Sequence, residues 1–372
     1  MGVDPDHAPL PNAAERLLGY FRDPDVGFVC GPQFYGNATS FLTRCAESQA
    51  SVFQSVIQRA ANSGLCAMFV GTNNAYRVSA FDQVGGFQDS ITEDMATSLA
   101  IHGALNSRGA RWKSVYTPDT VAIGEGPTTW ADYFSQQLRW ARGADEIWAH
   151  GGLPTLLRRL QAKQALHYVL MMSYYPSMAV TWLLGALLMV LPVLTGVSGL
   201  TLSTPVWLSL YGNLAICQIG LYVWLRRFSV SPHEPAESSG WRGLFLSAIT
   251  APLYCRAAVA TVLRRKASFV VTPKGAAAST DSLTVFRTGL AWSLLPLGGL
   301  GLAVADHRVH VGMVCWVVVL LATCLSPAVV WWVTRWHSAR RPGAPRPLPA
   351  PRLDDELARL TGTVTSSKEL VS

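Results

Sequence analysis

Residues 164–225 read QALHYVLMMSYYPSMAVTWLLGALLMVLPVLTGVSGLTLSTPVWLSLYGNLAICQIGLYVWL and contain no Asp, Glu, Lys or Arg over 62 positions. A helix that crosses a bilayer needs about 20 apolar residues. The stretch is therefore long enough for two crossings, joined by the Gly/Ser/Thr-rich turn at 196–204. The buried core of a soluble protein would not stay uncharged over such a length. This stretch predicts an α-helical membrane region.

Working outward from this stretch, we expect four membrane spans, near 168–192, 205–225, 288–305 and 311–333. The apolar segment 243–263 has basic residues at both ends, so we expect it to lie along the membrane surface as an interfacial helix. Lys and Arg residues accumulate on the cytoplasmic side of membrane proteins. The basic flanks of the spans therefore predict a multi-pass protein of the cell membrane with both its N-terminal region and its C-terminus in the cytoplasm.

The composition agrees with a membrane protein and excludes several other classes. Half of the 372 residues are hydrophobic and only 14% are charged, whereas a soluble domain has about 25% charged residues. The net charge of +7 divides into −2 for residues 1–163 and +9 for residues 164–372, so the excess lies in the apolar half. No basic cluster with interleaved aromatic residues is present, which excludes nucleic-acid binding. Seven cysteines without a C-x-x-C pair argue against a disulfide framework or a zinc site.

The chain divides into three regions. Residues 1–163 are polar with an α/β pattern, in which we expect strands at Val26–Cys30 and Leu65–Val70 and a helix at Thr39–Ala61. Residues 164–341 form the membrane region. Residues 342–372 are rich in Pro and Arg and are predicted to be a disordered cytoplasmic tail. The expected fold class is α/β followed by a transmembrane helix bundle.

Asp4-Pro5-Asp6 places two carboxylates two positions apart near the start of the chain. In an extended segment that leaves a strand, such a pair can share one divalent cation, which in turn binds a diphosphate. A solvated loop is the alternative interpretation of this motif taken alone.

Thr92-Glu93-Asp94 follows a Gly-Gly turn and precedes a helical pattern that extends to about Leu105. Thr92 is a suitable N-cap, which would put Glu93 and Asp94 in the first turn, where the helix dipole favours ionised carboxylates. A general base for a sugar hydroxyl needs such a carboxylate. The alternative is simple first-turn electrostatics.

Gln136, Arg139 and Trp140 lie within one predicted helix, where their spacing lets all three address one site. A guanidinium suits a diphosphate and an indole face suits a sugar ring. An interfacial helix with an aromatic belt is the alternative. A fourth motif, Phe269-Val270-Val271-Thr272-Pro273-Lys274-Gly275, reads as a loop that carries a hydroxyl and an amine.

These four motifs, in this order, resemble the D-x-D, T-E-D, Q-x-x-R-W and F-x-V-T-x-K-G motifs of membrane-embedded family 2 glycosyltransferases, and among them the catalytic subunits of cellulose synthases. The resemblance covers roughly residues 1–335. It implies the C-terminal part of a GT-A-type domain in residues 1–163, on the cytoplasmic side of a transmembrane channel.

The resemblance also implies a role for each motif. Asp4 and Asp6 would bind Mg²⁺ or Mn²⁺ together with the diphosphate of a UDP-sugar. Asp94 would accept the proton of the acceptor hydroxyl, with Thr92 and Glu93 beside the substrates. The remaining positions would line the donor and acceptor sites, namely Gln136, Arg139 and Trp140 on the helix and Thr272 and Lys274 on a gating-type loop at 267–280. The growing glycan would leave past aromatic residues such as Trp182, Trp207 and Tyr211.

Three departures from the family pattern modify this expectation. The chain begins at the D-x-D motif, so we expect an N-terminally truncated enzyme or one whose donor-binding half comes from a partner. Met68–Thr72 replaces the Phe-Phe-Cys-Gly-Ser segment of cellulose synthases, and the connection from His102 to Trp112 is longer than the family's. The short segment after the last span leaves no room for a cyclic-di-GMP-binding domain.

The sequence therefore predicts an inverting glycosyltransferase that adds sugar from a UDP-sugar, with UDP-glucose favoured, to a β-linked polysaccharide and extrudes it. Its partners would be the UDP-sugar, the growing glycan, the bilayer and an accessory export subunit. Two alternatives stay open. One is a non-processive transferase acting on a lipid or short glycan, and the other is a non-catalytic membrane subunit.

Overall fold

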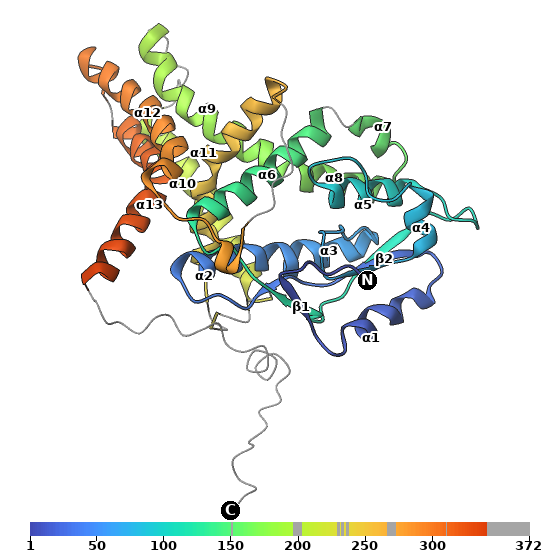
Figure 1. Ribbon diagram of the computed structural model, residues 1–372. Helices are drawn as coiled ribbons and strands as arrows, with labels where there is room; N and C mark the ends of the chain where they lie inside the picture. Colours follow the sequence, from blue (N-terminus) through green and yellow to red (C-terminus); the bar gives the residue numbers. More distant parts are fainter. Residues whose placement is uncertain are drawn as a thin grey trace, which may run out of the picture.

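The computed structural model describes residues 1–149, 152–195, 203–228, 231, 234–235, 238–265, 273–309 and 311–340. The predicted tail and residues 266–272 of the fourth motif's loop lie outside these ranges. Figure 1 shows the N-terminal region and the long helices of the C-terminal half as two connected parts.

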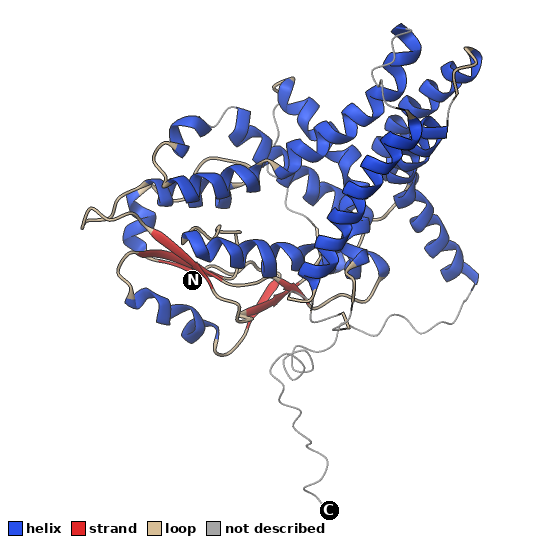
Figure 2. Ribbon diagram, turned by 180° about the vertical axis from the view of Figure 1, so that it is seen from behind, coloured by secondary structure: helices blue, strands red, loops and turns tan. Residues whose placement is uncertain are grey.

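The strands of the N-terminal region form two three-stranded sheets (Figure 2). One has the order β4-β2-β5 and the other the order β1-β6-β3. In the first sheet β2 pairs antiparallel with β4 and parallel with β5, and in the second β6 pairs antiparallel with β1 and parallel with β3. The strands are β1 His7–Pro9, β2 Val26–Cys30, β3 Phe34–Tyr35, β4 Asn74–Tyr76, β5 Lys113–Tyr116 and β6 Ala122–Gly124.

Helices pack around the first sheet. The helices of this region are α1 Ala13–Leu18, α2 Phe41–Val52, α3 Gln58–Ala61, α4 Val78–Gln83, α5 Glu93–Gly103, α6 Trp130–Ala149, α7 Leu153–Leu157 and α8 Ala162–Met172. Strand β2 is buried throughout, as its apolar run predicts. Its Val26 and Val29 pack with α1, whereas Phe28 and Cys30 belong to the larger core with α5 to α8. A register shift at Val26/Phe28 accounts for this uneven alternation.

Two predicted elements differ in detail from the structure. The predicted helix Thr39–Ala61 forms as α2 and α3 joined by a π-helical turn at Phe53–Ile57. The predicted strand Leu65–Val70 is wrong, since these residues form no ladder. Their backbone groups bond to side chains instead: Met68 exchanges two hydrogen bonds with the Gln58 amide, at 2.7 and 2.9 Å, and Phe69 N donates to Ser98 Oγ at 2.7 Å.

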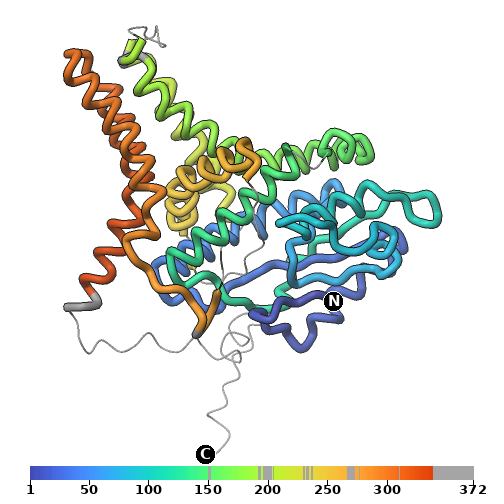
Figure 3. Tube along the Cα trace, turned by 45° about the horizontal axis from the view of Figure 1, so that its top comes forward, coloured from blue at the N-terminus to red at the C-terminus, as the bar shows by residue number. Residues whose placement is uncertain are grey.

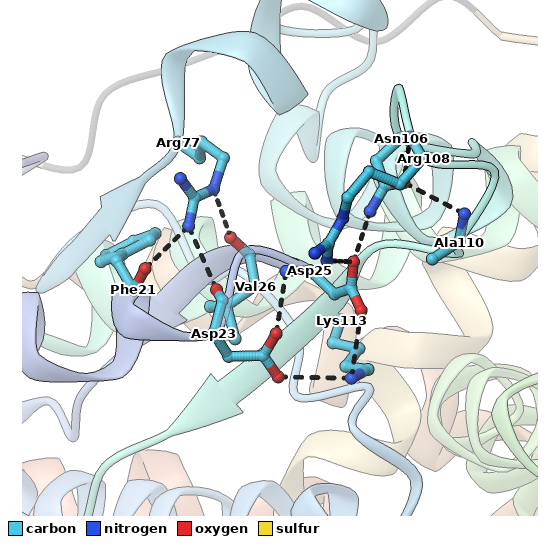
Figure 4. A network of polar contacts seen from close by, with 9 residues as sticks. All are labelled: Phe21, Asp23, Asp25, Val26, Arg77, Asn106, Arg108, Ala110 and Lys113. Atoms are coloured by element: carbon cyan, nitrogen blue, oxygen red, sulfur yellow. Dashed lines mark hydrogen bonds and ion pairs between the residues drawn. The ribbon is translucent and has the colours of Figure 1, made fainter.

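The long connection between α5 and β5 is held by a surface polar network (Figure 4). Asn106 Nδ2 and the Arg108 guanidinium both donate to Asp25 Oδ1, and Lys113 Nζ lies 3.5 Å from Asp25 Oδ2. Lys113 also lies 3.3 Å from Asp23 Oδ2. The extra residues of this connection are therefore anchored to the turn that precedes β2.

Five helices among the described residues are long and apolar enough to cross a membrane, in the windows Tyr174–Leu191, Pro205–Arg226, Trp241–Val262, Leu283–Ala305 and Val311–His337. They correspond to α9 Tyr174–Thr195, α10 Thr204–Arg226, α11 Trp241–Val262, α12 Arg287–Ala305 and α13 Val311–Arg340. The first begins six residues after the predicted boundary at 168, because α8 ends at Met172 and its last residues pack into the core of the N-terminal region. Figure 3 shows α12 and α13 running alongside one another.

Helix α11 coincides with the segment predicted to lie along the membrane surface, and by length and composition it could also cross. It packs along α6 (Figure 1). Near its start, Ser247 Oγ accepts a hydrogen bond of 3.0 Å from Gln49 of α2, and just beyond its end the Arg265 carbonyl accepts one from Arg142 of α6. Both ends of α11 thus contact the N-terminal region, and the interfacial position stays a prediction.

The aromatic residues proposed for a glycan path take two different positions. Trp182 is buried between helices, where its indole N–H donates to Thr323 Oγ1 at 2.9 Å. Trp207 stacks on Tyr211 with ring centroids 5.3 Å apart, and both rings meet Trp316 of α13 edge-on.

Candidate active site

Asp4 and Asp6 occupy the turn before β1, which begins at His7. His7 Nδ1 lies 3.1 Å from Asp6 Oδ1, and one ligand atom from each of the three side chains lies within 4.8 Å of the others. Asp4 is exposed and Asp6 is half-buried, so a ligand can reach both, whereas the imidazole is buried. The donor set fits a divalent cation, because carboxylate oxygens suit Mg²⁺ and Mn²⁺. The sequence analysis missed His7, although this residue directly follows the second carboxylate.

A tight turn connects these carboxylates to the second motif. Asp4 N donates to Thr72 Oγ1 at 2.9 Å. The preceding Gly71 has a positive φ of 81°, and a β-carbon on it would lie 3.7 Å from Asp94 Oδ2. Glycine is the residue that adopts this backbone conformation without strain. The turn at 71–72, part of the segment that departs from the cellulose synthase pattern, therefore lies between the two carboxylate motifs.

Asp94 lies in the first turn of α5, as predicted. Its Oδ1 accepts a hydrogen bond of 2.7 Å from Met95 N. Burial of the carboxyl, reinforced by the Glu93 charge, raises the pKa of Asp94 to about 7, although the Met95 N–H and the Arg139 guanidinium act in the opposite direction. The expectation that the helix dipole keeps this carboxylate fully ionised is wrong, because desolvation outweighs it. A carboxyl with this pKa is well matched to a general base.

Thr92 precedes the helix at the N-cap position but does not cap it with its side chain, contrary to expectation. Its hydroxyl is buried without a hydrogen-bond partner among the described residues. The reason is close packing, since a β-carbon on Gly143 of α6 would lie only 2.3 Å from Thr92 Cγ2. The glycine lets α6 lie directly against the second motif.

Helix α6 carries the third motif. Gln136 is buried, and Arg139 and Trp140 are half-buried. The effect of Arg139 on the Asp94 pKa shows that the guanidinium lies close enough to sense that carboxyl. The neighbouring Gln137, which the motif does not include, accepts a hydrogen bond of 2.7 Å from Tyr254 OH of α11.

The fourth motif returns to the first. Lys274 Nζ pairs with Asp6 Oδ2. Burial alone would raise the pKa of Asp6, but the His7 contact and the Lys274 ammonium outweigh it and hold that pKa well below its usual range. Thr272 and Phe269 lie outside the described residues. Of the four motifs, described residues of the first, second and fourth are thus linked by contacts, and the third is linked to the second through Gly143 and Arg139.

Comparison with known proteins decides the family. The model of "Glycosyl transferase family group 2" matches residues 3–336. The chain therefore belongs to glycosyl transferase family group 2. Members of this family generally use a divalent metal ion, which agrees with the donor set at Asp4, Asp6 and His7.

Individual relatives narrow the likeness to cellulose synthase-like enzymes. This glycosyltransferase is 29% identical over 151 residues to a UDP-forming cellulose synthase, in its catalytic chain, of Dictyostelium discoideum, which is 40% of this chain and 14% of that protein. It is 30% identical over 161 residues to "Probable glucomannan 4-beta-mannosyltransferase 7" of Oryza sativa subsp. japonica, 42% of this chain and 26% of the relative. It is 26% identical over 179 residues to "Cellulose synthase 2" of Novacetimonas hansenii, 46% of this chain and 11% of the relative. The chain thus spans only a fraction of each relative's length.

Proposed function

We propose that this glycosyltransferase transfers a sugar from a UDP-sugar to the end of a β-linked polysaccharide with inversion, and passes the product outward between its membrane helices. The observation that carries the proposal is the position of Asp94, a carboxyl of pKa about 7 beside Arg139 and one turn of chain away from Asp4. UDP-glucose is the first donor to test, because two of the similar proteins are cellulose synthases by name.

In the proposed reaction, the Asp94 carboxylate accepts the proton of the acceptor hydroxyl as the hydroxyl oxygen bonds to the anomeric carbon. The bond between that carbon and the diphosphate oxygen breaks on the opposite face, and UDP leaves. Arg139 and Lys274 supply positive charge for the diphosphate. Asp4, Asp6 and His7 would hold the divalent cation, which when bound neutralises charge on the leaving group. A non-catalytic subunit would have no use for a carboxyl tuned in this way.

A mannosyl donor is a second candidate, since the relatives also include glucomannan mannosyltransferases at 30% identity. The residues that contact the transferred sugar decide between glucose and mannose. Incubation with either nucleotide sugar, followed by analysis of the product's monosaccharides and chain length, separates the two donors and also separates a polymerase from a transferase that adds one sugar.

We further propose that the catalytic region lies in the cytoplasm at the cell membrane. Arg226 at the end of α10 pairs with Glu234, and Ser231 of the same connection donates to Glu47 of α2 at 2.9 Å. Asp281, just before α12, accepts hydrogen bonds from the first N–H groups of α6. These contacts support placing the end of α10 and the start of α12 on the same side as the catalytic region.

The test of the proposed function is Asp94→Asn in the natural full-length protein. The amide is isosteric but cannot accept the proton at neutral pH, so we expect transfer to fall by about 10²-fold or more. The matched control is Asp89→Asn, an aspartate in the preceding loop, which should leave the rate unchanged. Transfer by Asp94→Asn at more than a tenth of the normal rate, with the protein folded and inserted, would overturn the assignment of the base.

A further inference from the structure

Lys274 and its following residues form a short segment with two different anchors. One end is the ion pair between Lys274 and Asp6. Next to it Gly275, with a positive φ of 56°, leaves a β-carbon position 3.6 Å from Glu125 Oε2, and Glu125 N in turn donates to the Asp6 carbonyl at 3.2 Å. This end of the segment therefore rests on the edge of the strand pair that carries the candidate metal ligands.

The other end is attached to the N-terminus of α6 by hydrogen bonds in both directions. Asp281 accepts from Trp130 N at 3.1 Å and from Ala131 N at 2.9 Å, which satisfies two N–H groups that a helix start leaves free. Asp132 of α6 accepts from Ser279 N at 2.9 Å. This anchor involves no metal-binding side chain, so events at Asp4 and Asp6 need not disturb it.

The two anchors differ in how they should respond to a divalent cation. Asp4 and Asp6 place two like charges within 4.8 Å of each other and of His7. One ammonium can balance only one of these carboxylates, whereas a divalent cation balances both. Asp6 Oδ2 cannot hold the ammonium and the metal in the same position, so the two cations compete.

We propose that Lys274 is the built-in counter-ion of Asp6 and that a divalent cation binding at Asp4 and Asp6 displaces it, releasing residues 274–277 while Ser279 and Asp281 keep the segment attached to α6. The freed ammonium then becomes available to the diphosphate that accompanies the metal. Lys274 thus acts as a positioning residue that couples metal binding to the placement of its own segment. This inference rests on the metal site of the proposed function.

The first experiment measures Mn²⁺ affinity by electron paramagnetic resonance of free Mn²⁺, on the full-length protein in detergent without nucleotide. We expect Lys274→Gln to bind Mn²⁺ about fivefold more tightly than the natural protein, the size expected for loss of a partly exposed ion pair. Lys113→Gln removes the same charge from the surface network with Asp23 and Asp25 (Figure 4) and should leave the affinity unchanged.

The outcomes separate this inference from the proposed function. Equal Mn²⁺ affinity in Lys274→Gln and the natural protein overturns the competition, while the metal site still stands if Asp4→Asn weakens binding. Binding that Asp4→Asn does not weaken overturns the metal site itself, and the inference with it.

A second experiment follows the segment directly, with a spin label on a single cysteine after Cys217 and Cys315, the exposed cysteines, are replaced by alanine. On addition of Mg²⁺ we expect a label at Ala277→Cys to become more mobile. A label at Thr280→Cys, between the two residues that bond to α6, should stay unchanged. Unchanged mobility at 277 overturns the release, and increased mobility at 280 overturns the fixed anchor.

Discussion

The chemistry of the candidate site depends on how the protein treats a few individual charges. Asp94 is surrounded closely enough that burial dominates its ionisation, and Glu93 adds to the effect. Asp6 is also partly buried, but the adjacent His7 and the Lys274 ammonium keep it ionised. Two carboxyls of one site thus take opposite protonation tendencies, which is the arrangement that acid–base catalysis and cation binding need side by side.

The pKa of Asp94 has a direct consequence for the pH profile. A base works in its ionised form, so transfer should fall about tenfold per pH unit below pH 7. Glu93→Gln removes a neighbouring negative charge that raises this pKa, and the profile should therefore shift to lower pH. We would measure kcat/KM between about pH 5 and 9 in both proteins, at a saturating metal concentration.

The control for this shift is Asp89→Asn, which removes a more remote charge in the loop before the motif. Its profile should overlie that of the natural protein. A profile of Glu93→Gln that does not move, or that moves to higher pH, would contradict the assignment of the titrating group to Asp94.

At the scale of elements, the apolar patterns of the sequence were informative and the long-range contacts could not be read from it. Strand β2 and helix α6 follow from buried and helical patterns. Residues 66–70 do not form the predicted strand because side chains of Gln58 and Ser98 supply their hydrogen bonds. The pair of Lys274 with Asp6 joins positions 268 apart in the chain, and no local pattern predicts it. Gly143 likewise carries no local signal, since its role arises only when α6 meets the second motif.

The contact between α6 and the second motif can be tested through Gly143→Ala. The added methyl group would lie 2.3 Å from Thr92 Cγ2 and 2.5 Å from Thr92 Oγ1, so the helix or the motif must move. Overpacking of this kind costs about 1–3 kcal/mol, partly offset by the helix preference for alanine over glycine, roughly 0.5–1 kcal/mol. We expect a lower melting temperature by scanning fluorimetry and a reduced transfer rate.

Gly19→Ala is the matched control, because a β-carbon there meets nothing within 4 Å and its φ of −56° suits alanine. It should retain both stability and activity. If Gly143→Ala were as stable and active as Gly19→Ala, the close approach of α6 to the second motif would not be needed for the site.

At the scale of the whole molecule, the connection after α10 joins the membrane helices to the catalytic region through a buried ion pair. Arg226 and Glu234 have side chains only 1% and 3% exposed. Nearby, Glu47 of α2 accepts a hydrogen bond of 2.8 Å from Tyr35 N and one of 2.9 Å from Ser231 Oγ. The end of a membrane helix and the core of the catalytic region thus share one polar cluster, which fixes their relative position.

Removing one partner of this pair should therefore loosen the whole molecule. Glu234→Ala leaves the Arg226 guanidinium buried without its carboxylate, which costs about 3–5 kcal/mol, and should lower the temperature of half-inactivation steeply. Replacing both residues by apolar ones, Arg226→Met with Glu234→Leu, removes the buried charges together and should recover most of the loss. Asp119→Ala, which breaks the surface pair with Arg16, should cost about 1 kcal/mol or less. If Glu234→Ala behaved like Asp119→Ala, the junction would be held by apolar packing and not by the ion pair, and the two parts of the molecule would owe their arrangement to the contact of α11 with α6.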